Sequence, residues 1–224
     1  MLKTKFFLIV SLLVCCYSFM QAQDSGISFR LRAGDTTPFG GFAAVSADVN
    51  HSFENNFAVS GGVQYNSTGR TATEIRPAYI FDLENGNLST KVLLHYSHQS
   101  SIDNFAVGFG ADYSYKWLFL TAGYYYRIYG CNGSYMKEYF NLFYQGGLKC
   151  LPDVEEWDLN IYVTNCELFE LDRHYQPSLM IQGWWYPNKW LGVNLGVSYK
   201  HTGMFGIASD YYQLYGSTGI CYRW

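Results

Sequence analysis

Charge is scarce in this sequence, and long apolar runs are missing beyond its first residues. Charged side chains make up 15% of the 224 residues, against roughly 25% in ordinary soluble domains. After residue 22, no apolar run approaches the ~20 residues that a membrane-spanning helix needs. The formal net charge of −3 shows no basic excess of the kind that accompanies nucleic-acid binding. These absences argue against a helical membrane protein and against a nucleic-acid-binding domain.

Metal-binding patterns are absent as well. The sequence contains no CxxC pair, and His51, His174 and His201 are scattered along the chain without a ligand spacing. We therefore predict no metal site and no cofactor.

Residues 1–22 have the features of a targeting segment. A positive start with two lysines is followed by the apolar run Phe6–Val14, which is too short to span a bilayer, and Ala22 offers a cleavage site. Cys15 raises the alternative of a lipoprotein, but a valine precedes it where a small residue is usual. We predict a cleaved signal peptide over residues 1–22 and one domain over residues 23–224.

Aromatic residues, by contrast, are abundant, and the mature chain alternates between apolar and polar positions. Aromatic residues make up 19% of the sequence, with Tyr 21, Phe 16 and Trp 6. Alternation along the chain is typical of β-strands with one apolar face. About twelve such runs occur, an even number as in bacterial membrane barrels. The 224 − 22 = 202 mature residues give each strand roughly 17 with its connection, enough for the ~9–11 of a tilted membrane strand.

The turns fall into two sets that would lie at opposite ends of such a barrel. The turns assigned to the periplasmic side lie near Glu54–Asn56, Glu84–Asn87, Lys116, Pro152–Glu156 and Pro187–Lys189. The outer loops are assigned near Asp35–Gly41, Ser67–Gly69, Gln99–Asp103, Gly130–Lys137, Glu167–His174 and Thr202–Asp210, the last three being the longest. All six tryptophans then fall at the periplasmic end. This one-sided placement predicts an interfacial aromatic girdle. Its members are Trp117, Trp157, Trp185, Trp190 and Trp224, with Trp184 next to them.

The last eight residues, Ser217–Trp224, end on an aromatic side chain without a polar tail. Their pattern resembles the β-signal that delivers outer-membrane barrels to the barrel-assembly machinery. The mature chain thus resembles small outer-membrane β-barrels of Gram-negative bacteria, and Ala-Gln after a short signal peptide is similar to proteins of the Bacteroidota. This resemblance implies an all-β, transmembrane, antiparallel up-and-down barrel in the cell outer membrane, in contact with its lipid. The rival interpretation is a secreted soluble barrel or sandwich whose apolar face points inward.

Charged residues of both signs fall on the polar face of the predicted strands, which would face the lumen. They are Arg30, Arg32, Asp48, Glu74, Arg76, Lys91, Asp112, Arg127, Lys149, Asp158 and Lys200. These side chains can line a narrow, porin-like channel for small polar or anionic solutes. Alternatively, they pair across strands and close the lumen of a structural or surface-interaction barrel. Twelve strands permit either arrangement, and we favour the channel.

The segment Leu94–His98 contains the candidates for catalysis, because His95 and Ser97 share one face of a strand and can act as base and nucleophile. The pair resembles the His-x-Ser-Asn signature of outer-membrane lipid hydrolases, namely the lipid A deacylases and the phospholipase A. His98 replaces the asparagine of that signature, and no acidic residue lies at an obviously matching later position. The pair also faces the lumen here, whereas those hydrolases present it to lipid. A non-enzymatic barrel is therefore favoured, with a lipid hydrolase as the third alternative.

Four cysteines remain in the mature chain. Cys131 and Cys166 both fall at the outer end, in or beside neighbouring loops, so they are the candidates for a disulfide. Cys150 and Cys221 fall on non-adjacent strands and face opposite ways, which argues against their pairing. Free thiols at all four positions are the alternative.

Overall fold

The computed structural model describes residues 25–36, 40–84, 86–131, 134–167, 170–171, 177–201 and 212–224. Within these ranges every regular element is a β-strand. The described part of the chain includes no helix that could cross a membrane. The segment predicted to be a signal peptide, residues 1–22, lies outside the described residues, so its cleavage stays a prediction.

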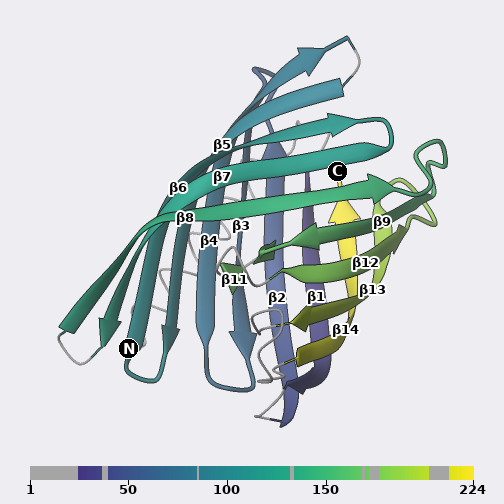
Figure 1. Cartoon of the computed structure of the whole chain (residues 1–224). Helices are drawn as coiled ribbons and strands as arrows, with labels where there is room; N and C mark the ends of the chain where they lie inside the picture. Colours follow the sequence, from purple (N-terminus) through teal and green to yellow (C-terminus); the bar gives the residue numbers. More distant parts are fainter. Residues whose placement is uncertain are drawn as a thin grey trace.

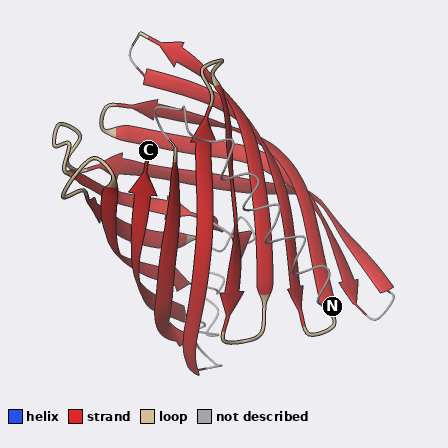
Figure 2. Cartoon of the chain, turned by 180° about the vertical axis from the view of Figure 1, so that it is seen from behind, coloured by secondary structure: helices blue, strands red, loops and turns tan. Residues whose placement is uncertain are grey.

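Twelve antiparallel strands form one closed barrel, in the order β1-β14-β13-β12-β9-β8-β7-β6-β5-β4-β3-β2. Figure 1 shows this wall of strongly tilted strands, and Figure 2 shows it from behind. The twelve strands are β1 (Gly26–Thr36), β2 (Gly40–Ser52), β3 (Phe57–Asn66), β4 (Thr71–Leu83), β5 (Gly86–Gln99), β6 (Ile102–Tyr115), β7 (Leu118–Cys131), β8 (Ser134–Lys149), β9 (Trp157–Thr164), β12 (Ser178–Trp185), β13 (Leu191–His201) and β14 (Tyr212–Arg223). Two short strands, β10 (Cys166–Glu167) and β11 (Glu170–Leu171), form a separate pair. The predicted all-β barrel of about twelve strands is confirmed.

The alternation in the sequence becomes an inner and an outer face. On β5, Leu93, His95 and Ser97 are buried, whereas Leu94 and Tyr96 between them are exposed, as the two-residue period of a strand requires. Large apolar side chains are exposed on strands all around the wall. The apolar face therefore points outward, which contradicts the rival soluble barrel with an apolar interior.

The last strand closes the barrel against the first. β14 pairs with β1 from Arg223 opposite Gly26 to Gln213 opposite Thr36. The backbone N–H of Trp224 also donates a hydrogen bond to the carbonyl oxygen of Ser25, at 3.1 Å. The C-terminal segment predicted from its aromatic ending thus forms the closing seam.

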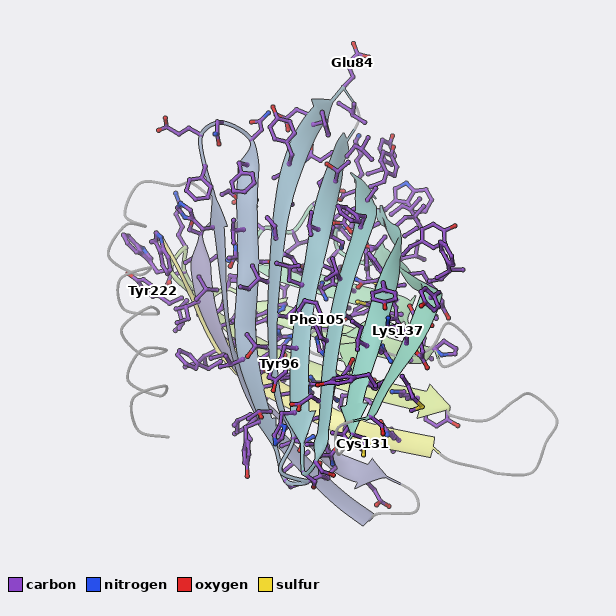
Figure 3. All side chains as sticks on the ribbon, turned by 90° about the vertical axis from the view of Figure 1, so that its left-hand side faces the viewer. Glu84, Tyr96, Phe105, Cys131, Lys137 and Tyr222 are labelled. Carbon is purple, nitrogen blue, oxygen red and sulfur yellow. The ribbon has the colours of Figure 1, made fainter. Side chains whose placement is uncertain are left out.

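The connections sort to two ends, which we call the tryptophan end and the loop end. Figure 3 shows Glu84 at the first and Cys131 at the second. The turns between β2 and β3, β4 and β5, β6 and β7, β8 and β9, and β12 and β13 all lie at the tryptophan end. All six tryptophans lie in those turns or beside them, or at the end of β14.

One predicted loop is wrong. Gly130–Lys137 was expected to be a long outer loop, but β7 continues to Cys131 and β8 already begins at Ser134, with these two residues opposite each other. Strand pairing therefore leaves only two residues for the connection, because Tyr129–Cys131 and Ser134–Met136 stay in register opposite each other. The predicted loop Thr202–Asp210 lies outside the described residues.

The wall is irregular on both sides of β8, against β7 and against β9. The register of β8 against β7 shifts between Tyr125 and Arg127, and Phe140 has a φ of 57°, which is the signature of a β-bulge. β9 pairs with β8 only from Gln145 to Lys149. Before Gln145, the side chain of Asn165 makes the hydrogen bonds to the backbone of β8 that a neighbouring strand would make. Its Oδ1 accepts a hydrogen bond from Tyr144 N at 2.7 Å, and its Nδ2 donates one to Leu142 O at 2.8 Å.

Candidate functional site

Ion pairs line the inside of the barrel between neighbouring strands. Arg30 Nη2 lies 2.7 Å from Asp48 Oδ1, joining β1 to β2, and Lys91 Nζ lies 2.6 Å from Asp112 Oδ1, joining β5 to β6. Arg76 pairs with Glu74 along β4. Arg127 Nη1 approaches Glu138 Oε2 at 3.9 Å, between β7 and β8.

The other predicted lumen residues make polar or aromatic contacts. The Arg32 guanidinium lies 5.4 Å from the ring centroid of Tyr215, Lys149 Nζ donates to Ser114 Oγ at 3.2 Å, and Asp158 Oδ1 accepts from Asn160 Nδ2 at 2.8 Å. Lys200 is buried. None of the eleven predicted residues is exposed; that they line an open lumen stays a prediction.

A polar cluster lies toward the loop end, with Glu74 and His95 fully buried and Arg76 partly exposed. His95 Nδ1 lies 3.2 Å from Glu74 Oε2, and the second oxygen of Glu74 holds Arg76. Arg76 Nη2 in turn reaches Cys166 Sγ at 3.5 Å. Since β4 and β9 are far apart in the barrel order, this contact shows that the chain after β9 turns into the interior.

The residues predicted as catalytic candidates, His95 and Ser97, both lie in this region but are not hydrogen-bonded to each other. Ser97 Oγ accepts hydrogen bonds from Arg70 Nη2 at 3.5 Å and Asn104 Nδ2 at 3.4 Å. His95 Nε2 is buried and has no hydrogen-bond partner among the described residues, so it is not bonded to Ser97. Sequence reasoning missed Glu74 as the partner of His95. The two lie 21 residues apart, and only the register of β4 against β5, which pairs Glu74 with His95, brings them together.

An apolar cluster lies on the inner face of β5 to β8. Leu93, Ala106, Tyr125, Phe143 and Cys166 form it, and each is buried. The ring of Phe143 lies over two glycines: a Cβ built on Gly110 would come within 2.4 Å of Phe143 Cζ, and one built on Gly123 within 2.2 Å. Glycine at these positions is what leaves room for the ring against β6 and β7.

A cavity of about 900 Å³ opens at the tryptophan end. It is bounded by β1, β2 and β14 on one side and by the two turns that flank β9 and β12 on the other. Its carboxylates are Asp48, Glu155, Glu156 and Asp158, and its cations are Lys189 and Arg223. The cavity was not predicted, because its walls come from segments more than 100 residues apart in the sequence.

Three flat groups stack along one wall of this cavity. The rings of Trp184 and Tyr186 are nearly parallel, at 9° with centroids 6.3 Å apart, and the Arg223 guanidinium lies 3.6 Å from the Tyr186 centroid. A Cβ on Gly192 would meet Tyr186 Cε1 at 2.5 Å, so this glycine makes room for the ring. Burial raises the pKa of Tyr186 to about 12, against a smaller opposite effect of Arg223, and the phenol is therefore neutral at biological pH.

The predicted girdle residues form smaller ring groups at the same end. Trp157 and Trp185 stack with centroids 6.1 Å apart, and Tyr222 contacts both Trp190 and Trp224. Trp117 is exposed beside the β6–β7 turn. That these rings lie at a membrane interface stays a prediction.

None of the four cysteines of the described residues forms a disulfide. Cys131 is exposed at the end of β7, whereas Cys166 is buried against Arg76. The structure therefore does not bring the predicted disulfide pair together. Among the described residues, histidine, cysteine and carboxylate side chains form no group that could hold a metal ion.

Comparisons with known proteins identify the fold and no family. No family model matches the chain, and no curated protein sequence matches it. Among solved structures, it is similar to the KdgM porin in complex with disordered oligogalacturonate, with 14% identity, a TM-score of 0.56 and coverage of 89% of this chain and 99% of that chain. It is also similar to the translocator domain of the autotransporter NalP from Neisseria meningitidis, with 12% identity, a TM-score of 0.59 and coverage of 92% and 90%. The outer membrane phospholipase A from Escherichia coli matches with 6% identity, a TM-score of 0.51 and coverage of 90% and 93%. At these identities the likeness establishes the barrel fold alone.

Proposed function

We propose that this chain is an outer-membrane β-barrel that forms a narrow channel for small polar solutes, anions among them. The observation that carries this proposal is the reversal of polarity across the wall. Apolar rings point outward, while ion-paired arginine, lysine and carboxylate side chains line the inside. Such a wall suits a lipid surround and a hydrated interior. The KdgM porin, which has the same fold, is consistent with this role.

Export and assembly belong to the same proposal. A cleaved signal peptide over residues 1–22 would carry the chain across the inner membrane of a Gram-negative bacterium. The segment Ser217–Trp224, which closes the barrel against β1, would then be read by the barrel-assembly machinery, and the tryptophan end would face the periplasm.

Planar-bilayer recording tests the channel. We expect small, stable conductance steps from the purified protein, because the ring of Phe143 is buried inside the barrel and takes up part of its interior. Phe143→Ala removes that ring and should enlarge the steps, whereas Phe109→Ala, which removes an outward-facing ring of the same size, should leave them unchanged. A protein that inserts but stays silent in all three forms would refute the channel and support a closed barrel that acts through its surface.

One observation keeps a second function under consideration. Glu74 holds His95 Nδ1 at 3.2 Å, which is how a carboxylate orients a general base, so a lipid hydrolase using His95 and Ser97 is testable. Lipid turnover by the purified protein that disappears in Ser97→Ala would establish it. Turnover that is absent, or that survives the substitution, would refute it.

A further inference from the structure

The cavity at the tryptophan end has the size and the form of a ligand site. Its volume of about 900 Å³ falls within the ~300–1,000 Å³ of sites for small molecules. The stack of Trp184, Tyr186 and Arg223 gives it one flat wall. The turn that carries Tyr186 is fixed to the neighbouring turn, because Tyr186 N donates to the carbonyl oxygen of Glu156 at 2.8 Å. The flat wall is thus held in place before any ligand arrives.

The charges around the cavity disfavour both kinds of ion. A free anion would approach the carboxylates of Glu155, Glu156 and Asp158, and a free cation would approach Lys189 and Arg223. The fourth carboxylate, Asp48, is already neutralised by Arg30 at 2.7 Å. The face of Tyr186 that would attract a cation is already occupied by Arg223.

A hydroxylated ligand meets neither difficulty. Each hydroxyl group both donates and accepts hydrogen bonds, so it can use the carboxylates of Glu155, Glu156 and Asp158 as acceptors and Lys189 and Arg223 as donors. The C–H face of a pyranose ring is apolar and flat, which matches the half-buried ring of Trp184.

We propose that this cavity binds a neutral carbohydrate, with a sugar ring stacked on Trp184 and its hydroxyls held by Asp158 and the glutamates of the β8–β9 turn. This site rests on the proposed channel, because the cavity would lie at the mouth of its lumen. Neutral carbohydrate would then be the class of solute that the channel takes.

The chain provides a matched control for the stacking residue. Trp184 and Trp185 are consecutive residues at the end of β12, but Trp184 lines the cavity, whereas Trp185 is exposed on the outer face and stacks on Trp157. Trp184→Ala and Trp185→Ala therefore remove the same side chain from opposite faces of one strand. Gly192→Ala gives a third variant, because its Cβ would meet the Tyr186 ring at 2.5 Å and Cys221 Sγ at 2.6 Å, so it crowds this wall without removing any ring.

The test measures binding of glucose, glucuronate and glucosamine to the full chain. These share one ring and differ in charge, provided that the buffer is mildly acidic so that the amine of glucosamine is charged. The protein is held in an amine-oxide detergent, because a detergent with a sugar head group would compete. Tryptophan fluorescence and calorimetry report binding, and migration before and after heating shows that each variant is folded.

We expect glucose to bind more tightly than either charged sugar. Binding should weaken about tenfold in Trp184→Ala, the equivalent of one lost stacking contact, weaken also in Gly192→Ala, and stay unchanged in Trp185→Ala. Absence of binding, equal loss in both tryptophan variants, or tighter binding of glucuronate or glucosamine would each overturn the proposal. If the protein binds glucose but conducts no current, the channel fails and the carbohydrate site stands. If the protein conducts but binds no sugar, the carbohydrate site fails and the channel stands.

Discussion

At the scale of single residues, the interior is shaped by glycines that accommodate rings. The ring of Phe143 lies over Gly110 and Gly123, and the ring of Tyr186 lies over Gly192. In each case the inward-facing position of one strand has no side chain, so that a bulky side chain from another segment fits. This arrangement fixes where the lumen is filled, around Phe143, and where it is open, beside Tyr186.

Gly123→Ala should destabilise the barrel. Its Cβ would lie 2.2 Å from Phe143 Cζ and 2.4 Å from the carbonyl oxygen of Phe109, and the backbone atom cannot yield. Overpacking of this kind costs about 1–3 kcal/mol, to be measured as the free energy of unfolding in urea. Gly41→Ala is the control, because nothing lies within 4 Å of its Cβ. Equal stability of the two variants would contradict the packing described for Phe143.

Glu74→Gln should be more severe. The substitution leaves the largely buried Arg76 without its carboxylate and weakens the hydrogen bond to His95. Removing one partner of a buried ion pair typically costs about 3–5 kcal/mol. Asp103→Asn, which alters an exposed pair with His98, should change the unfolding free energy little. A small effect of Glu74→Gln would mean that Arg76 is stabilised from elsewhere.

At the scale of the element, two-residue periodicity predicts most of the wall. It identifies the strands and the side on which each residue lies, because a strand has no other period. Strand registers are harder to predict, since each is fixed by the whole set of pairs on both sides. Glu74 and His95 illustrate this: both were expected on the inner face, but their contact depends on the β4–β5 register.

Departures from regular pairing were not predictable either. The bulge at Phe140 depends on a backbone φ of 57°. Because the residue at this position is a phenylalanine rather than a glycine or an asparagine, the sequence does not indicate a positive φ there. The inward turn after β9 depends on the side chain of Asn165 bonding to the edge of β8. The cavity at the tryptophan end was not predictable for a related reason: Tyr186 enters it only because Gly192 on a neighbouring strand leaves space.

The closing strand gives a prediction at this scale. If the assembly machinery reads the aromatic ending of Ser217–Trp224, then Trp224→Ala combined with Tyr222→Ala should sharply lower the amount of assembled barrel in cells. Assembled protein is measured by the difference in gel migration between unheated and heated membranes. The control is Trp190→Ala, which removes a ring from the same group at the same end but lies outside the closing strand. A similar loss in the control would point to the ring group itself rather than to a signal.

At the scale of the whole molecule, the outer face carries exposed large apolar side chains on strands all around the barrel. Phe109, near the middle of β6, and Leu195, near the middle of β13, are each 67% exposed. A soluble protein rarely exposes a continuous apolar surface of this kind, and a barrel in a bilayer requires one. The tryptophans at one end and the residues at the tip of β8 at the other mark where that band should stop.

Arginine substitutions can locate the band. Phe109→Arg places a charge at the middle of the outer face and should cost about 2–4 kcal/mol if that face meets lipid at mid-depth. Met136→Arg is the matched control, because Met136 is also 67% exposed but lies near the loop end of β8, where the cost should fall to about 0–1 kcal/mol. The measurement is the free energy of unfolding in urea from phosphatidylcholine vesicles, followed by tryptophan fluorescence. If both substitutions cost little, the outer face lies in water, and the membrane location, the girdle and the channel all fail together. If only Phe109→Arg is costly, the apolar band is lipid-facing, and the strand tips beyond it extend into the aqueous phase on the loop side.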